Sequence, residues 1–148
     1  MEDRYLFKAK RIDNGEWVQG YLFDDGFENG RMFVGGLVIE EYNGTACDAW
    51  SITGINFCEV DPSTICQCTG LKDRNGKLIW ENDICDRKEE YPEIVKYNNG
   101  DWTLDYSYSK GKESGYCYCN LGFYALERKY VEVIGNIFDN PELLEVGE

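Results

Sequence analysis

Apolar residues recur at short range between turn signals, and no long stretch repeats them with the period of a helix. Short runs spaced by about 8–12 residues are typical of antiparallel β proteins. The pattern predicts strands at residues 5–10, 16–23, 31–40, 50–60, 64–69, 77–80, 93–97, 102–108 and 130–138. Asp13-Asn14-Gly15 and Asn98-Asn99-Gly100 separate consecutive runs, and both predict hairpin turns because Asn and Gly accept positive φ angles.

Helix signals are few. Asn140 before Pro141 predicts a short helix near the C-terminus, with Asn at the N-cap and Pro at the first helical position. Residues 121–129 allow a second short helix, although their pattern is ambiguous. A chain of 148 residues fits one domain. We therefore expect a single domain over residues 1–148 that is mainly β, a small barrel-like or sandwich antiparallel sheet with a short C-terminal helix.

The composition indicates a folded protein, since 43% of the residues are hydrophobic and 15% are aromatic. No run of 18 apolar residues occurs, so no membrane-spanning helix is expected. The first residues, Met1 to Arg4, do not resemble a signal peptide, and we expect the protein in the cytoplasm.

The charge is strongly negative, with 28 Asp and Glu against 15 Lys and Arg, a net charge of -13. Residues 21–65 contribute eight acidic side chains and Arg31 alone as a base, so the acidity is concentrated at about residues 24–61. Such a field attracts basic partners and disfavours the phosphate backbone of nucleic acids. A purely solubilising role for the acidity is an equally good interpretation.

The seven cysteines are odd in number and follow no secretion signal, which argues against a disulfide framework. Two pairs, Cys66/Cys68 and Cys117/Cys119, would each present both thiols on one face of a strand. Together they suggest a four-thiolate zinc site, but structural zinc sites favour two to four intervening residues. We therefore interpret these cysteines as small apolar strand residues, and we expect no metal and no cofactor.

One stretch is more distinctive than the rest. Residues 64–84, TICQCTGLKDRNGKLIWENDI, resemble the central signature of the YopX family of phage and prophage proteins. Residues 7–22 are similar to the opening block of that family, and residues 132–144, EVIGNIFDNPELL, to its closing block. The acidic segment of about residues 24–61 lies between these blocks and is expected to be a variable part. The resemblance implies a mainly β fold with a small barrel-like sheet and an origin in a phage or integrated element, but it implies no reaction and no catalytic residues.

The distinctive motifs have folding roles first. Asp73 to Gly76 predicts a hairpin turn, Asp83 is expected to accept hydrogen bonds from backbone amides of its corner, and Gly135 would let another backbone approach. The functional alternative is a single binding surface. Its residues would be Lys72, Asp73, Trp80, Asp83 and Asn136.

Three function classes follow. The first is a non-enzymatic interaction module that acts on a basic host or phage protein, one form of which is an acidic mimic of nucleic acid. The second is an enzyme, a hydrolase that uses paired carboxylates such as Asp24 and Asp25, or Glu89 and Glu90, although adjacent carboxylates point to opposite faces in a strand and are usually solvated in a loop. It is disfavoured because the chain has no histidine, so a cysteine nucleophile would lack the usual base.

The third class is a nucleic-acid-binding small β-barrel, disfavoured by the overall charge. Its basic residues would be Lys72, Arg74, Lys77, Arg87 and Lys88. Self-association is compatible with all three classes, since exposed strand edges and many aromatic residues are often buried in an oligomer, and we predict a homo-oligomer.

Overall fold

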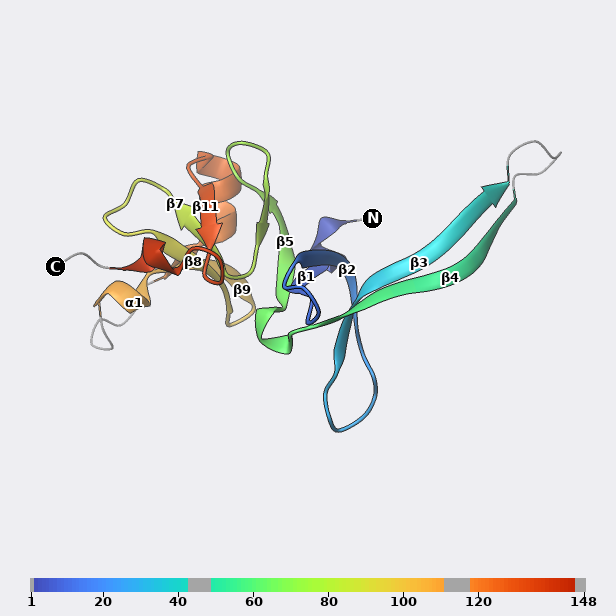
Figure 1. Ribbon diagram of the computed structural model, residues 1–148. Helices are drawn as coiled ribbons and strands as arrows, with labels where there is room; N and C mark the ends of the chain where they lie inside the picture. The colour runs from blue at the N-terminus through green and yellow to red at the C-terminus, as the bar shows by residue number, and fades with distance from the viewer. Residues whose placement is uncertain (1, 43–48, 111–117, 146–148) are drawn as a thin grey trace. The chain divides into compact units, whose positions relative to one another are not determined.

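The computed structural model describes residues 2–42, 49–110 and 118–145, and the chain divides into two compact units (Figure 1). We call Leu6–Ile65 the arm unit, and Met1–Tyr5 together with Cys66–Glu148 the core unit. The single domain expected over residues 1–148 stays a prediction.

The arm unit is an antiparallel sheet with the strand order β4-β3-β2-β1. Its elements are β1 (Phe7–Lys10), β2 (Trp17–Asp24), β3 (Met32–Tyr42), β4 (Ala49–Val60) and the 3-10 turn η2 (Pro62–Thr64). β2 pairs with β3 only from Tyr21 to Asp24, whereas the β3–β4 pairing continues to Tyr42 and Ala49. A two-stranded arm therefore extends beyond the rest of this sheet (Figure 1).

The arm unit has a small core on one face of its sheet. Ala9, Val34 and Val60 are fully buried, and half-buried neighbours such as Leu22 and Met32 pack against them. The strand register places Leu22 opposite Val34 and Met32 opposite Val60, so these side chains share one face. The other face of the sheet is outside this core.

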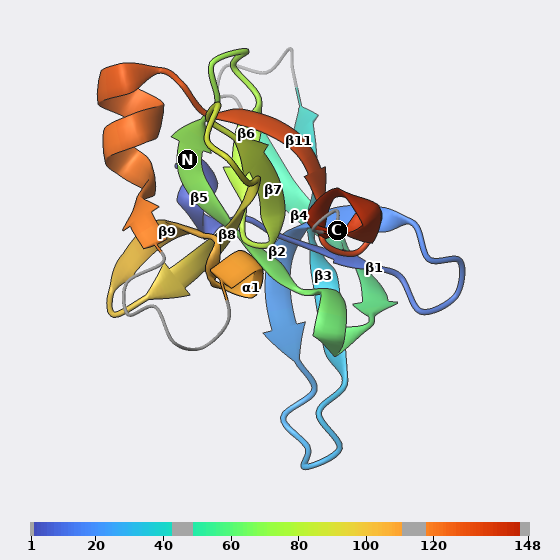
Figure 2. The same cartoon turned by 90° about the vertical axis from the view of Figure 1, so that its left-hand side faces the viewer.

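The core unit contains a five-stranded antiparallel sheet with the order β10-β9-β8-β7-β11 and a separate β5–β6 hairpin. The strands are β5 (Cys66–Lys72), β6 (Leu78–Trp80), β7 (Asp83–Asp86), β8 (Glu93–Asn98), β9 (Asp101–Asp105), β10 (Tyr118–Asn120) and β11 (Glu132–Asn136). The short helices are η1 (Asp3–Tyr5), α1 (Ser107–Lys110), the π-helix η3 (Phe123–Arg128) and η4 (Pro141–Leu144). Figure 2 shows η3 in orange beside the strands of this unit.

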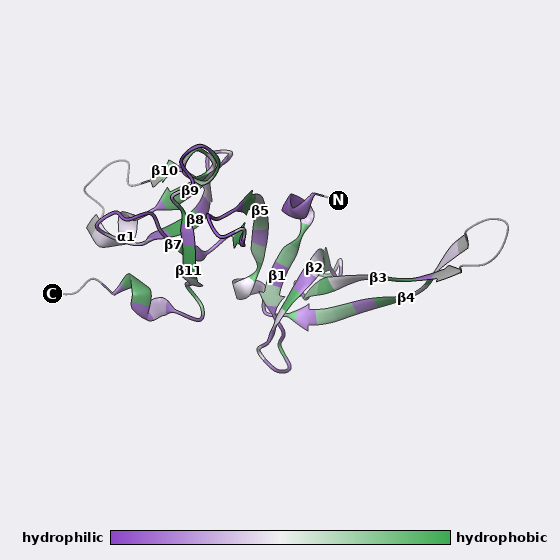
Figure 3. Ribbon diagram, turned by 90° about the horizontal axis from the view of Figure 1, so that it is seen from above, coloured by the Kyte–Doolittle hydropathy of each residue, from purple (hydrophilic) through white to green (hydrophobic). Residues whose placement is uncertain are grey.

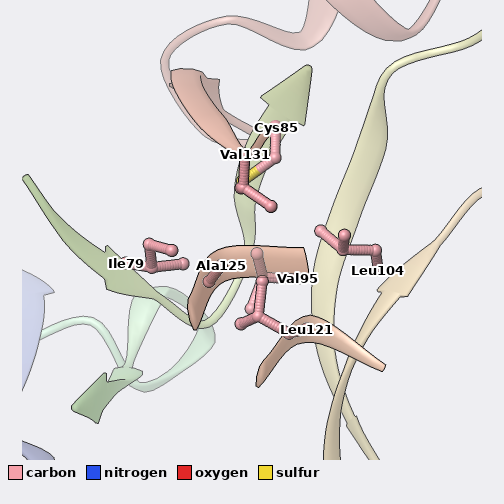
Figure 4. Packing of buried hydrophobic residues seen from close by; sticks show 7 residues of the cluster. All are labelled: Ile79, Cys85, Val95, Leu104, Leu121, Ala125 and Val131. Atoms are coloured by element: carbon pink, nitrogen blue, oxygen red, sulfur yellow. The ribbon is translucent and has the colours of Figure 1, made fainter. Parts of the chain in front are cut away.

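The core unit buries a larger apolar cluster, which joins its strands to η3. The cluster consists of Ile79, Cys85, Val95, Leu104, Leu121, Ala125 and Val131 (Figure 4). Strand β6 of the hairpin, strands β7, β8 and β9 of the five-stranded sheet, and the helix η3 each contribute a side chain to the cluster. Burial of this cluster is the main apolar contribution to the stability of the unit.

The structure confirms the predicted mainly β, antiparallel class and the predicted strands to within a few residues. Asn99 and Gly100 have φ angles of 51° and 87°, as the β8–β9 hairpin requires. Among the described strands no sheet closes into a barrel, because β4 ends one strand order and β10 and β11 end the other. The ambiguous residues 121–129 are helical, and the predicted C-terminal helix is the 3-10 turn η4.

One described strand, β10, was missing from the prediction, and β7 was expected only as a short strand of unstated length after the corner at Glu81 to Asp83. β7 is the four-residue sequence DICD, whose polar ends hide its apolar middle, and β10 has only three residues. In the described part of the chain no helix is long and apolar enough to cross a membrane.

Candidate functional site

The five residues of the predicted binding surface lie in the core unit, and the structure buries three of them. Asp73, Trp80 and Asp83 are exposed by only 6%, 6% and 3%. Lys72 is exposed at the end of β5, and Asn136 is half-buried at the end of β11. A buried side chain contributes little to a docking surface, so each of the three needs a local explanation.

Asp73 organises the β5–β6 turn and attaches it to β11. Its Oδ1 accepts hydrogen bonds from the backbone N–H groups of Asn75 and Lys77, each at 2.9 Å, and its Oδ2 accepts one from Val133 at 3.0 Å. Burial alone would raise the pKa of Asp73, but these three donors outweigh it and hold the pKa below its ordinary value. The carboxylate therefore stabilises the fold in its ionised form.

Asp83 closes the corner between β6 and β7. Its Oδ2 accepts a hydrogen bond from the backbone N–H of Trp80 at 2.8 Å, which confirms the predicted role of Asp83. Asn82 lies inside this corner with a φ of 66° and donates its backbone N–H to the carbonyl of Val95 at 2.8 Å. The corner is thus connected to the five-stranded sheet.

Asn136 and Asn140 form a second polar corner after β11. The Oδ1 of Asn136 accepts from the backbone N–H groups of Phe138 and Asp139, at 3.0 and 2.9 Å. The Oδ1 of Asn140 accepts from the backbone N–H of Asn136 at 3.3 Å, whereas its side chain makes no capping bond to η4. A Cβ at Gly135 would lie 2.5 Å from this Oδ1, so a side chain approaches the glycine, where the sequence suggested a backbone.

These contacts support the folding roles that the sequence indicated. A joint binding role of Lys72, Asp73, Trp80, Asp83 and Asn136 stays a prediction.

The basic residues considered for nucleic-acid binding are partly engaged with carboxylates. Arg74 forms an ion pair with Glu132 at 2.6 Å. Arg87 forms ion pairs with Glu93 at 2.5 Å and with Glu89 at 3.1 Å. These pairs reduce the positive charge that a phosphate backbone would meet.

Among the described residues Glu93 is the most buried charged side chain, and its ion pair with Arg87 was not found by sequence reasoning. Glu93 is 1% exposed and Arg87 10% exposed, and the guanidinium also lies 4.3 Å from the ring of Tyr124. Burial raises the pKa of Glu93 above its ordinary value, against the lowering effect of Arg87. The only sequence signal was the charged run of residues 86–93, which reads as a solvated loop.

A cavity of about 110 Å³ lies beside this pair. Its lining residues are Arg87, Glu89, Glu90, Tyr91, Glu93 and Tyr106. The carboxylates of Glu89 and Glu93 both face Arg87, so this part of the cavity is an internal ion-pair network. The carboxylates of Glu89 and Glu90, considered as a pair from the sequence, both line the cavity, and that of Glu89 is engaged with Arg87.

Two thiols of the core unit, those of Cys85 and Cys119, have pKa values above the ordinary value. Burial raises the pKa of the Cys85 thiol well above its ordinary value, and burial also raises that of Cys119, although the Arg87 Nη2 donates to Cys119 Sγ at 3.2 Å. Cys66 and Cys68 are buried strand residues, as the sequence favoured. Cys117, the partner of Cys119 in the second pair, lies outside the described residues.

The arm unit presents apolar side chains on the face of its sheet opposite the core. Cross-strand pairing places Leu37 opposite Ile55 and Ile39 opposite Ile52. We call this surface the outer face, and its members are Phe23, Leu37, Ile39, Trp50, Ile52, Ile55 and Phe57; the half-buried Phe33 and the exposed Glu59, opposite each other, lie on the same side of the sheet. Hydrophobic residues recur along β3 and β4 in Figure 3, and the members other than Phe57 are 50–66% exposed.

Comparison with known proteins gives one family and a fold. The YopX protein family matches residues 9–145, a range that runs through both units. Comparison with curated proteins gives no match. Protein EF1440 from Enterococcus faecalis, solved as a crystal structure, is similar with a TM-score of 0.53 and 23% identity, over 94% of this chain and 96% of that chain. At this identity the likeness concerns the fold alone, whereas the match to the YopX model covers nearly the whole chain: the chain belongs to the YopX family.

Proposed function

We propose that the chain is a non-enzymatic protein-interaction module, encoded by a phage or prophage, that acts in the bacterial cytoplasm on a basic host or phage protein. The observation that carries this proposal is the excess of exposed carboxylates in the arm unit. Residues 21–65 hold eight acidic residues and one base, Arg31, and that base is paired with Asp25 at 2.8 Å.

The bases near the start of the arm unit are too few to neutralise this excess, since residues 6–65 hold ten acidic residues and four bases. Arg11 forms an ion pair with Asp13 at 2.5 Å, and the ammonium groups of Lys8 and Lys10 lie 4.9 and 5.4 Å from the ring of Trp17. Exposed carboxylates such as those of Glu28 and Glu59 therefore produce a negative field around the unit. A field of this sign steers a basic partner toward it and, in one form of the proposal, imitates the charge of nucleic acid.

A pull-down from nuclease-treated host lysate tests the proposal with two charge-matched baits. The first replaces three exposed glutamates of the arm unit, Glu28→Gln, Glu40→Gln and Glu59→Gln. The second replaces three exposed glutamates of the core unit. These changes are Glu127→Gln, Glu142→Gln and Glu145→Gln.

We expect the unmodified bait and the core-unit variant to retain one basic, nucleic-acid-handling protein at moderate salt, and the arm-unit variant to lose it. Competition by duplex DNA would identify the mimic form of the proposal. Recovery of the bait alone, or equal retention by both variants, would overturn the proposal.

A further inference from the structure

A second feature of the arm unit points to a different partner. In a sheet that buries one face, the opposite face is ordinarily polar, because it meets water. Here the buried face carries Val34 and Val60, yet the outer face also carries large apolar side chains, from Phe23 at one end to Trp50 at the other. We propose that this outer face is the surface through which two copies of the chain associate.

The register makes this series a single surface. Leu37 and Ile39 lie two positions apart on β3, so they point to the same side, and their partners Ile55 and Ile52 lie beside them on β4. A register shift between Val38 and Ile39 accommodates the extra residue of β4 and keeps the apolar residues aligned. At the base of the arm the rings of Phe23 and Phe57 meet edge-to-face at 4.7 Å and continue the surface.

The arm also lacks the support that a sheet ordinarily gives. Beyond Gly35, β3 pairs with β4 and with no other described strand, so this part is a two-stranded ribbon. An isolated hairpin is marginally stable in water, and a third layer or a packed face is needed to stabilise it. Packing the outer face against a second copy would supply that layer.

The area and the chemistry favour a second copy over the basic protein proposed above. Six large side chains that are 50–66% exposed present on the order of 600 Å² of apolar surface. Two such faces would bury about 1,200 Å² together, which is the lower limit for a specific interface. The outer face is formed mainly by aliphatic and aromatic side chains, with the exposed carboxylate of Glu59 on the same side near Phe57 and Phe33, so its apolar part is complementary to itself in a two-fold dimer.

Sedimentation equilibrium of the full chain tests the inference. The wild type should populate a species of twice the 17.1 kDa chain mass in a concentration-dependent manner. The double variant Leu37→Thr/Ile55→Thr places threonine, which has a high strand propensity, at both positions but removes apolar area, and we expect its dissociation constant to rise roughly tenfold or more. The matched control is Val38→Thr, which lies on the other face of β3 and is 43% exposed. We expect it to change the constant by less than about twofold.

Ionic strength separates this association from binding of a basic protein. Each copy carries a net charge of -13, so added salt screens the repulsion between copies and should strengthen the dimer. The same salt should weaken the binding of a basic partner. The inference does not depend on that partner, and either can fail without the other.

A wild type that stays monomeric at every concentration and salt would overturn the inference. So would a double variant that associates as tightly as the wild type and retains its far-UV circular dichroism. If the double variant does not fold, the single variant Ile39→Thr on the same face provides the second test, and its dissociation constant should also exceed that of Val38→Thr.

Discussion

The core unit and the arm unit differ in where they place their apolar residues. The core unit buries a cluster that extends over its hairpin, its sheet and η3. The arm unit buries Ala9, Val34 and Val60, and leaves a series of larger side chains on its outer face in contact with solvent. The two antiparallel sheets therefore differ in role. The sheet of the core unit is stabilised by its own buried cluster, whereas the sheet of the arm unit has apolar surface available for another molecule.

The polar groups show the same difference. In the core unit, Asp73, Asp83 and Glu93 are buried and bonded to backbone amides or to a guanidinium. In the arm unit, Asp25 and Asp61 accept backbone N–H groups within exposed turns. Buried polar networks specify one arrangement of the core unit, while the turns of the arm unit fix only local geometry.

The largest effect is expected from Arg87→Met, which leaves the buried carboxylate of Glu93 without its cation. Removal of one partner of a buried pair costs about 4 kcal/mol in the free energy of unfolding. Urea unfolding followed by tryptophan fluorescence would measure it. The control is Arg74→Met, since Arg74 is 40% exposed in its pair with Glu132, and its loss should cost about 0.5 kcal/mol.

The pH dependence of Arg87→Met follows from the same carboxylate. Burial already raises the pKa of Glu93, and removal of Arg87 takes away the effect that opposes it. An acid with a raised folded pKa binds its proton more tightly when folded, so stability is present at low pH and is lost as the pH rises through that pKa. The deficit of the variant should therefore shrink toward pH 4 or so, near the ordinary pKa of glutamate. A deficit that is equal at acidic and neutral pH would contradict this explanation.

The arm unit should respond most to Gly35→Ala. A Cβ at this position would collide with the carbonyl oxygen of Asn56 on β4, so the β3–β4 register must shift, at a cost of about 3 kcal/mol. At the adjacent Gly36 a Cβ would meet only the Cδ2 of Tyr21 at 3.8 Å, an ordinary contact, and Gly36→Ala should cost about 0.5 kcal/mol. Hydrogen exchange of β3 and β4 amides measures both, and equal protection in the two variants would show that the close approach is unimportant.

Features that depend on neighbouring residues were predictable from the sequence. The turn at Asn99 and Gly100 needs two positive φ angles, and this residue pair adopts them readily. The role of Asp83 was predictable because its hydrogen-bond donor, Trp80, is three residues away. The bounds of β7 were not predictable, since a four-residue strand with aspartate at both ends has no alternation to detect.

Features that depend on pairing between distant segments were not predictable. Asp73 accepts from Val133, 60 positions away, so a turn residue also attaches β11 to the hairpin. The sequence predicted a strand that includes Leu37 and Ile39. It did not show which face of the sheet these side chains occupy, because that depends on which residues of β4 lie opposite them. The burial of Glu93 likewise requires the fold, because its sequence neighbours are charged.

A smaller effect is expected from Asp73→Asn. An asparagine Oδ1 can still accept from Asn75 and Lys77, but its amide group places a donor against the backbone N–H of Val133, which costs about 2 kcal/mol. Because the folded pKa of Asp73 is lowered, its contribution is present above the ordinary pKa of about 3.9 and is lost as the pH falls through the folded pKa. Urea unfolding at neutral and strongly acidic pH should show the two proteins converging in acid.

Asp105→Asn is the matched control for Asp73→Asn. Asp105 Oδ1 accepts a hydrogen bond from the backbone N–H of Ser107 at 2.8 Å, and an asparagine Oδ1 can accept the same bond. Its substitution should change the free energy of unfolding by less than about 0.5 kcal/mol. An equal loss in both variants would mean that the net charge, and not the bond to Val133, is responsible.

The smallest effect compares the same substitution in each unit. Gly15 in the β1–β2 turn and Gly100 in the β8–β9 turn have φ angles of 71° and 87°, and a Cβ at either would have no atom within 4 Å. Alanine at each position should therefore cost about 1 kcal/mol in the free energy of unfolding, from backbone strain alone.

Since the local cost is the same, hydrogen exchange of the surrounding amides reports how strongly each unit resists opening. We expect amides of β1 and β2 in Gly15→Ala to exchange faster than those of β8 and β9 in Gly100→Ala, because the arm unit has the smaller buried cluster. The reverse order would show that the arm unit is the better stabilised of the two, and would remove the reason to expect that a second copy supports it.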